Sequence, residues 1–416
     1  MTKAMDVCEE KIAPPASAPL PGPWPGAWMI GEEEVQAVME VMRAKSPFRH
    51  YGPHVLGKAR EFEKAFAARM DTRYALGVTS GTAALIVGLA GLEVGLEDEV
   101  IMPAYTWVSC PSAVVALGGV PVMAEVDESL SLDPEDLERR ITPRTKAIMV
   151  VHVGGVAAGM DRIMAVARKH GLRVLEDCAQ SCGASFRGKP IGSMGDAGAF
   201  SLQLNKIITT GDGGVVVASD PRVHERAVRY HDLGFLRPQF DIQAQGKAFF
   251  GNNYRMSELT AAVALVQLGR LDGILKTMRK IKSGLTARIA DLPGMLLRQA
   301  PDPAGDAAVT LVLLAPAPQA ADRLVAALGA EHIACDKPYG GRTLYENWAD
   351  CFQSWLAARR ACGARALAQS YAPGLCPRTE ALLKRTVCIS LVPILTREHV
   401  ASIGDRIRRA WRTTVG

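Results

Sequence analysis

The stretch from Tyr74 to Leu85 reads Tyr-Ala-Leu-Gly-Val-Thr-Ser-Gly-Thr-Ala-Ala-Leu, and it decides the fold. Its first five residues form a short apolar run that is typical of a buried strand. The small residues from Thr79 to Thr82 then open a helix. A strand that enters a helix through a small-residue turn is the building unit of α/β proteins, so we expect a sheet flanked by helices.

The same alternation continues along the chain. Further strands are expected at 99–102, 121–125, 147–153 and 173–176, and helices at 31–42 and 59–70, after Tyr105 and from Asp161. Strands that alternate with helices form mostly parallel sheets. Ligands of such sheets bind at the carboxyl ends of the strands, so the loops that follow these strands should carry the functional residues.

A long helical stretch is expected at 257–289. Beyond it the sequence pattern changes to shorter strands, which are expected at 309–314 and 387–391. A chain of 416 residues is also longer than one core usually serves. We therefore predict three parts: an irregular, partly proline-rich segment at 1–25, a large domain at 26–275 whose mostly parallel sheet lies between helices, and a smaller α+β domain at 276–416.

The composition is that of an ordinary globular protein, with 48% apolar and 22% charged residues. The 48 basic and 43 acidic residues are scattered, which argues against nucleic acid as a partner. The basic group from Arg406 to Arg412 has the spacing of a solvated helix face. There is neither a signal peptide nor an apolar run of the roughly 18 residues that a membrane span needs, so we expect a cytoplasmic protein without a membrane partner.

The nine cysteines contain no Cys-x-x-Cys pair and are expected to be reduced thiols. Cys178 and Cys182 lie four residues apart, but no histidine is close to them in sequence, so we expect buried small side chains and assign no metal. His152 follows an apolar strand and is expected to be a structural histidine with satisfied hydrogen bonds.

Lys206 is the first candidate for chemistry. The stretch from Ser201 to Gly214 reads Ser-Leu-Gln-Leu-Asn-Lys-Ile-Ile-Thr-Thr-Gly-Asp-Gly-Gly, which places Lys206 in a small-residue loop between two apolar segments. A lysine in such a loop can approach a carbonyl closely, and burial lowers its pKa enough to supply the neutral amine that a Schiff base needs. The alternative, a phosphate-binding loop of nucleotide-binding proteins, requires a different order of glycines and lysine.

Asp177 follows the expected strand at 173–176 and should face the ligand crevice. A carboxylate at this position can keep a pyridine nitrogen protonated, which makes the ring an electron sink. Taken alone, Asp177 could equally cap a following helix. Its position relative to Lys206 favours the first interpretation.

Two further loops could hold a flat, phosphorylated ligand. Ser80, Gly81 and Thr82 open a helix, where free N–H groups and hydroxyls suit a phosphate monoester, although helix capping explains them equally well. Trp107 follows the strand at 99–102 and offers a surface on which a pyridine ring could stack, although a single tryptophan can also be part of the core.

Together these elements resemble the sugar aminotransferases of the DegT/DnrJ/EryC1/StrS type, a family of fold-type I pyridoxal-phosphate enzymes. The wording is most similar to that of amino-cyclitol aminotransferases and aminohydroxybenzoate synthases. Four motifs carry the resemblance in the family's order: Ser80–Leu85, Glu176–Gln180, Lys206 before Gly211–Gly214, and Gly251–Met256. The resemblance implies the α/β fold of fold-type I aminotransferases, with a smaller α+β C-terminal domain.

The resemblance also implies roles for single residues. Lys206 would hold pyridoxal 5'-phosphate as a Schiff base and later act as the base that moves a proton, and Asp177 would pair with the pyridine nitrogen. Trp107 would stack on the ring, and Gln180 would lie near its phenolic oxygen. The phosphate would be held by Ser80, Gly81, Thr82 and Ser201. Asn253 would reach the phosphate of a neighbouring subunit, which implies a homodimer with shared active sites.

The implied activity is transfer of an amino group from an amino acid, with glutamine or glutamate expected, to a small polyhydroxylated keto-cyclitol or keto-sugar in antibiotic or amino-sugar biosynthesis. Lys206 itself argues against the family's dehydratases, in which histidine replaces the lysine. Two alternatives remain: a dehydrating and aromatising enzyme of the aminohydroxybenzoate-synthase type, and a non-catalytic relative that acts as a partner protein. Ser390 to Pro393 stand where nucleotide-sugar members often carry a histidine, so the family's substrate contacts from this region do not carry over, and the use of a nucleotide-sugar is left open.

Four loop residues are candidates for substrate contacts, because hydroxyl-rich ligands need hydrogen-bonding partners and aromatic surface. They are His50, Tyr51, Lys337 and Tyr339. Each of them is explained equally well as an ordinary loop residue.

Overall fold

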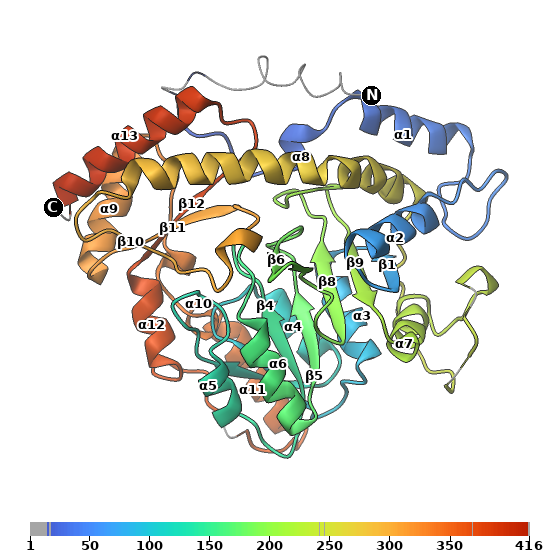
Figure 1. Cartoon of the computed structure of the whole chain (residues 1–416). Helices are drawn as coiled ribbons and strands as arrows, with labels where there is room; N and C mark the ends of the chain where they lie inside the picture. Colours follow the sequence, from blue (N-terminus) through green and yellow to red (C-terminus); the bar gives the residue numbers. More distant parts are fainter. Residues whose placement is uncertain (1–14, 16–17, 241, 245, 368, 415–416) are drawn as a thin grey trace.

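The computed structural model describes residue 15 and residues 18–240, 242–244, 246–367 and 369–414 (Figure 1). Cys8 and most of the predicted segment at 1–25 lie outside these residues. The helices are η1 (Ala27–Met29), α1 (Glu32–Arg43), α2 (Lys58–Arg69), α3 (Gly81–Gly91), α4 (Ser109–Ala116), α5 (Pro134–Arg139), α6 (Met160–His170), α7 (Pro221–His231), η2 (Pro238–Phe240), α8 (Glu258–Ile289), η3 (Pro303–Gly305), α9 (Pro318–Ala330), η4 (Pro338–Gly340), α10 (Leu344–Asn347), α11 (Ala349–Ala361), α12 (Pro377–Lys384) and α13 (Arg397–Thr414).

The strands form one large and two small sheets. They are β1 (Tyr74–Val78), β2 (Glu99–Pro103), β3 (Val120–Ala124), β4 (Thr145–Val151), β5 (Arg173–Asp177), β6 (Ser185–Phe186), β7 (Lys189–Pro190), β8 (Ala197–Ser201), β9 (Gly214–Ala218), β10 (Leu296–Leu297), β11 (Thr310–Leu314) and β12 (Thr386–Ser390). The large sheet has the order β1-β9-β8-β5-β4-β2-β3. Only β9 runs antiparallel to its neighbours, so the expected mostly parallel sheet is confirmed.

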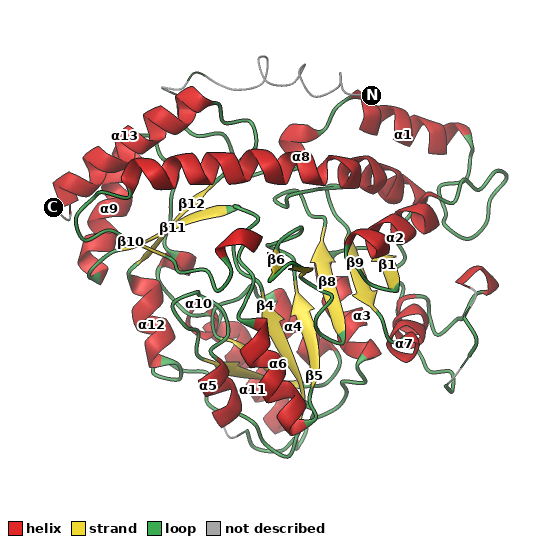
Figure 2. Cartoon of the chain, in the orientation of Figure 1, coloured by secondary structure: helices red, strands yellow, loops and turns green. Residues whose placement is uncertain are grey.

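Helices cover both faces of the large sheet, with α6 in front of it and α3 and α4 behind it in Figure 2. Side chains alternate between the two faces along each strand. In β2, Val100 and Met102 pack in the cluster that contains α3, α4 and α7, whereas Ile101 packs in the cluster that contains α2, α6 and α8. Burying each of these side chains contributes about 1.5–3 kcal/mol, which explains why the parallel strands are apolar throughout.

The C-terminal part contains the antiparallel sheet β10-β11-β12, in which Leu311 pairs with Ile389. Helix α8 runs along both the large sheet and this smaller one (Figure 1). A continuous apolar cluster joins the two parts, because Leu275 and Met278 of α8 belong to the same cluster as Leu311. The boundary predicted at 275 falls within α8 and stays a prediction.

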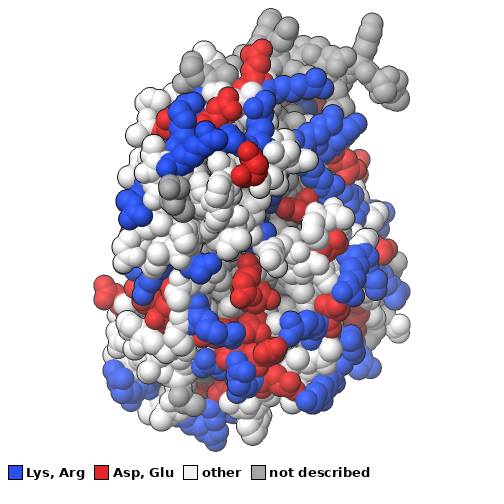
Figure 3. All heavy atoms as spheres, turned by 60° about the vertical axis from the view of Figure 1, so that its left-hand side comes forward, with Lys and Arg blue, Asp and Glu red and all other residues white. Residues whose placement is uncertain are grey.

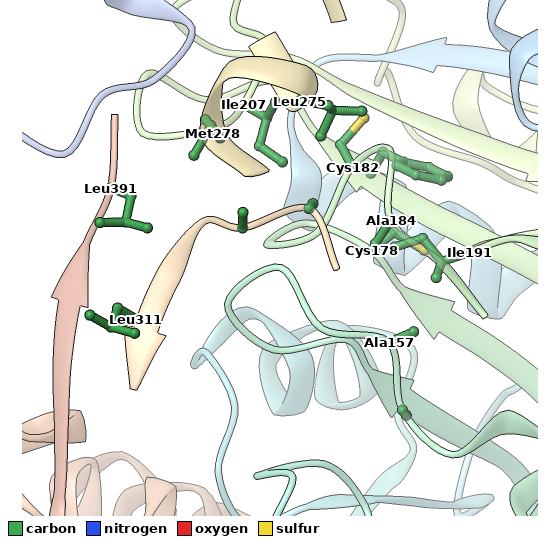
Figure 4. Packing of buried hydrophobic residues seen from close by; sticks show 14 of the residues in the cluster. Ala157, Cys178, Cys182, Ala184, Ile191, Ile207, Leu275, Met278, Leu311 and Leu391 are labelled. Carbon is green, nitrogen blue, oxygen red and sulfur yellow. The ribbon is translucent and has the colours of Figure 1, made fainter. Parts of the chain in front are cut away.

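Cys178 and Cys182 are buried and belong to the large apolar cluster, as expected. Figure 4 shows Cys182 beside Leu275 of α8, and Cys178 beside Ala184 and Ile191. Burial raises the pKa of both thiols, so they remain protonated.

Charged side chains of both signs are interspersed on the face shown in Figure 3. Two basic residues of α13 are paired with acidic ones: Arg408 lies 2.8 Å from Asp291 and Arg409 lies 2.7 Å from Glu331. Among the described residues, no helix is both long and apolar enough to cross a bilayer.

Candidate active site

The loops with candidate residues meet at one edge of the large sheet. Strands β1, β2, β4, β5 and β8 all point in one direction, so their carboxyl ends lie along the same edge. Ser80 follows β1, Trp107 follows β2, and Asp177 ends β5. Lys206 lies in the loop after β8, which returns as β9. The topology therefore brings these four residues to the same end of the molecule.

The first turn of α3 packs directly against β8 and β9. Ser80 caps the helix by accepting the N–H of Ala83 at 3.0 Å. A Cβ on Gly81 would lie 2.6 Å from the Cβ of Ser201, and a Cβ on Gly214 would lie 2.3 Å from the carbonyl oxygen of Ser80. Because Gly81 and Gly214 have no side chains, the predicted phosphate-binding residues Ser80, Gly81 and Ser201 can lie close together. The first N–H groups of a helix have no partner within it and can bind an anion there.

Asp177 is only 4% exposed and has a partner at each carboxylate oxygen. Oδ1 accepts the N–H of Ala179 at 3.0 Å in a turn, and Oδ2 accepts the thiol of Cys110 at 3.1 Å. No helix begins between Cys178 and Asp220, so helix capping does not explain this carboxylate. The contact with Cys110 was not predicted from the sequence.

The backbone of Lys206 is fixed by its neighbours. Its N–H donates to the carbonyl of Gln203 at 2.9 Å, and its carbonyl accepts the N–H of Gly26 at 3.0 Å. Burial lowers the pKa of Lys206, while the nearby carboxylate of Asp177 opposes this shift. A lysine in this setting loses its proton more readily than an exposed one, and the neutral amine is a nucleophile or a base.

Trp107 belongs to an aromatic group that includes Tyr339. Trp107 is 52% exposed, and its ring contacts Tyr339 and Trp348 at centroid distances of 6.3 Å each. Burial raises the pKa of Tyr339, with further contributions from Cys110 and Asp177. Trp107 is therefore not a core residue, and of the four predicted substrate contacts Tyr339 lies near Asp177.

Gln180 and Asn253 belong to segments that contact the loop after β4 and a residue just before α3, respectively. Gln180 Oε1 accepts the N–H of Gly154 at 3.2 Å in the loop after β4. Asn253 is exposed, and the adjacent Tyr254 accepts the N–H of Thr79 at 3.0 Å, just before α3. An exposed Asn253 is available to a second chain, as the predicted shared site requires.

The remaining substrate candidates have other surroundings. The buried His50 side chain lies 3.3 Å from Asp232, and its pKa is lowered to about 4, mainly by burial and by Arg49. Tyr51 is 69% exposed and packs on Phe48. The ammonium group of Lys337 pairs with Asp322 of α9. Their roles as substrate contacts stay predictions.

Asp232 is a charged centre that was missed from the sequence. Burial alone would raise the pKa of Asp232, but hydrogen bonds from Arg237 and Arg255 lower it below its ordinary value. The proximity of His50 to Asp232 could not be predicted, because the two residues are 182 positions apart in the chain.

Potential metal ligands of the buried residues His152, Glu176 and Cys178 lie within 4.8 Å of one another. Hydrogen bonds already engage this group. His152 Nε2 lies 3.0 Å from Glu176 Oε2, and its Nδ1 accepts the N–H of Ala158 at 3.0 Å. His152 thus has the satisfied structural environment that was expected.

The site fits pyridoxal phosphate in each of its parts. Lys206 is the amine with a lowered pKa, and the buried Asp177 can pair with a protonated ring nitrogen. Trp107 offers an open aromatic face, and the first turn of α3 with Ser80 offers N–H groups and hydroxyls for a phosphate.

Comparison with known proteins gives a consistent result. The DegT/DnrJ/EryC1/StrS aminotransferase family model matches residues 29–408. A Micromonospora echinospora protein named "Putative L-glutamine:3-amino-2,3-dideoxy-scyllo-inosose aminotransferase" is 35% identical over 277 residues, which are 65% of this chain and 64% of that protein. This chain thus covers just under two thirds of that relative. The spore coat polysaccharide biosynthesis protein SpsC of Bacillus subtilis (strain 168) is 36% identical over 64% of this chain and 69% of its own length.

Among solved structures, 3-amino-5-hydroxybenzoic acid synthase superposes with a TM-score of 0.81 at 28% identity, covering 95% of this chain and all of that one. S. venezuelae DesV in complex with a ketimine intermediate gives a TM-score of 0.75 at 31% identity over 91% of this chain and 94% of its own. These neighbours confirm the fold-type I aminotransferase architecture that was expected from the sequence.

Proposed function

Because the chain belongs to the DegT/DnrJ/EryC1/StrS aminotransferase family, we propose that it is a pyridoxal-phosphate-dependent transaminase that moves an amino group from an amino acid to a keto-cyclitol or keto-sugar. The observation that carries the proposal is the proximity of Lys206 and Asp177 at the carboxyl edge of the sheet, where the Asp177 charge acts on the Lys206 amine. Pyridoxal phosphate, when bound, supplies an aldehyde that carries the amino group and a ring that accepts electrons.

The residues of the chain would then perform separate tasks. Lys206 Nζ binds the cofactor and afterwards moves the proton at the substrate carbon. Asp177 keeps the proton on the ring nitrogen. Trp107 supports one face of the ring, and Ser80 and Ser201 hold the phosphate with the N–H groups of α3. Gln180 lies on the same edge and would contact the ring oxygen.

A cyclitol acceptor with glutamine as donor is supported by the name of the Micromonospora echinospora relative. We propose that the reaction serves antibiotic or amino-sugar biosynthesis in the cytoplasm. The exposed Asn253 supports a homodimer in which each site uses a residue of the partner. A second candidate is the dehydration and aromatisation of an amino precursor, which the superposition with 3-amino-5-hydroxybenzoic acid synthase favours.

The test is an absorption scan of the protein with pyridoxal phosphate, before and after glutamine, glutamate and other amino acids are added in turn. Transamination predicts a visible band that one donor bleaches, followed by an aminated product when a keto-cyclitol is supplied. Lys206→Ala should lack the band. A lysine-dependent band that no donor changes would favour the second candidate, and the absence of any band would refute both.

A further inference from the structure

A chain of hydrogen bonds joins the C-terminal part of the protein to Asp177. The hydroxyl of Tyr339 in η4 donates to the carbonyl oxygen of Thr106 at 2.6 Å. Thr106 Oγ1 lies 2.9 Å from Cys110 Sγ, and Cys110 Sγ lies 3.1 Å from Asp177 Oδ2. Three segments that are far apart in sequence thus meet behind one carboxylate.

The donors in this chain can be assigned without ambiguity. An ionised carboxylate only accepts hydrogen bonds, so the single thiol hydrogen of Cys110 must point at Asp177. The sulfur is then left to accept the hydroxyl of Thr106. Burial and the charge of Asp177 raise the pKa of Cys110, so the thiol keeps its proton. Every side-chain link therefore donates toward Asp177.

The backbone of Tyr339 is strained. Its φ of 48° and ψ of 36° lie in the left-handed region, which residues other than glycine rarely adopt. The same residue packs its ring against Tyr105, at a centroid distance of 5.9 Å, and against Trp107. Strained backbone persists where the surrounding structure holds it and is concentrated at functional sites.

Both oxygens of Asp177 are held from the protein side, Oδ1 by Ala179 and Oδ2 by Cys110. We infer that Cys110 and Tyr339 are positioning residues, which fix the plane of the carboxylate that holds the proton on the cofactor's ring nitrogen. This inference rests on the proposed function and adds two residues to it. Cys110 acts on Asp177 directly, and Tyr339 acts through the loop that carries Thr106 and Trp107.

The test is a pH titration of the visible absorption of the cofactor-loaded protein. A proton on the ring nitrogen is a nearby positive charge, which lowers the pKa of the nitrogen that Lys206 contributes. A misaligned Asp177 holds that proton less well, so the titration midpoint should rise, by about half a pH unit for Cys110→Ala. Tyr339→Phe should give a smaller shift in the same direction, and Cys110→Ser, which keeps a donor, should restore the midpoint.

Cys182→Ala is the matched control, because Cys182 is also a buried cysteine but packs in an apolar cluster away from Asp177 and donates no hydrogen bond to it. Midpoints of Cys110→Ala and Tyr339→Phe that equal the control's would overturn the inference, even if both variants melted at lower temperature. If Cys110→Ala fails to fold, Tyr339→Phe decides alone against the control. A wild-type protein without a visible band would instead refute the proposed function.

Discussion

Glu176→Gln should destabilise the protein strongly, although it changes a single atom. The buried carboxylate of Glu176 accepts four hydrogen bonds. Oε1 accepts the N–H groups of Met194 and Gly195 at 2.8 and 2.6 Å. Oε2 accepts the N–H of Gly192 at 2.8 Å and lies 3.0 Å from His152 Nε2. An amide has one oxygen and one NH2 group, so in either orientation two donors would face the NH2 group.

The magnitude follows from those two lost acceptors. A buried donor without a partner costs about 1–3 kcal/mol, so Glu176→Gln should lower the free energy of unfolding by about 2–6 kcal/mol. A change of tautomer at His152 cannot relieve this, because His152 Nδ1 already accepts the N–H of Ala158. The backbone N–H groups of the loop that contains Gly192 and Gly195 should be the first to lose their protection against hydrogen exchange.

Urea unfolding followed by circular dichroism measures this change. Glu135→Gln is the control, because Glu135 is an exposed carboxylate that pairs with Arg162 at 3.2 Å. An exposed pair of this kind is worth at most about 1 kcal/mol. Equal unfolding midpoints for Glu176→Gln and Glu135→Gln would show that the four bonds of Glu176 do not stabilise the native state.

Two further predictions concern pH and cofactor binding. Burial lowers the pKa of His50 and His224 to about 4 and that of His231 to about 3. In the unfolded chain these histidines bind protons below about pH 6.5, whereas in the folded protein they stay neutral to a lower pH. The free energy of unfolding should therefore be unaffected by these histidines above about pH 6.5, and below it should fall by about 1.4 kcal/mol per pH unit for each of them. Thermal melts between pH 7 and 4.5 should show this loss, and His224→Phe should reduce its slope by one histidine's share; an unchanged slope would contradict the assignment. Gly214→Ala places a Cβ 2.3 Å from the Ser80 carbonyl, so the start of α3 must move and affinity for pyridoxal phosphate should fall at least about tenfold, by roughly 1.4 kcal/mol. Fluorescence titration measures this affinity. Gly159→Ala is the control, because nothing lies within 4 Å of a Cβ at that position. Equal affinities of the two variants would argue against a phosphate at the start of α3.

Much of the fold could be predicted from local sequence patterns. The strand at 74–78 has the predicted bounds, because a short apolar run before a small-residue turn is a strong signal. The antiparallel direction of β9 could not be predicted. Direction depends on how the loop with Lys206 closes against β8, and the apolar run at 215–217 is compatible with either direction.

The same limit applies to the site. Asp177 could be placed at the carboxyl edge of the sheet, because a strand was expected at 173–176, and Lys206 could be recognised from its small-residue loop between two apolar segments. The contact between Cys110 and Asp177 spans 67 residues, and nothing in either segment encodes the partner. The burial of the His50 side chain could not be predicted for the same reason, since its partner Asp232 lies at the distant end of α7.

Helix α8 also restricts how this protein can be recombined with its relatives. Its 32 residues extend over about 48 Å, and its apolar side contacts both sheets. A crossover at 275 would join half of this helix to a foreign half whose side chains evolved against other neighbours. Chimeras that exchange acceptor-binding regions should therefore place their junctions before Ser257 or after Ala290, so that the whole helix is inherited from one parent.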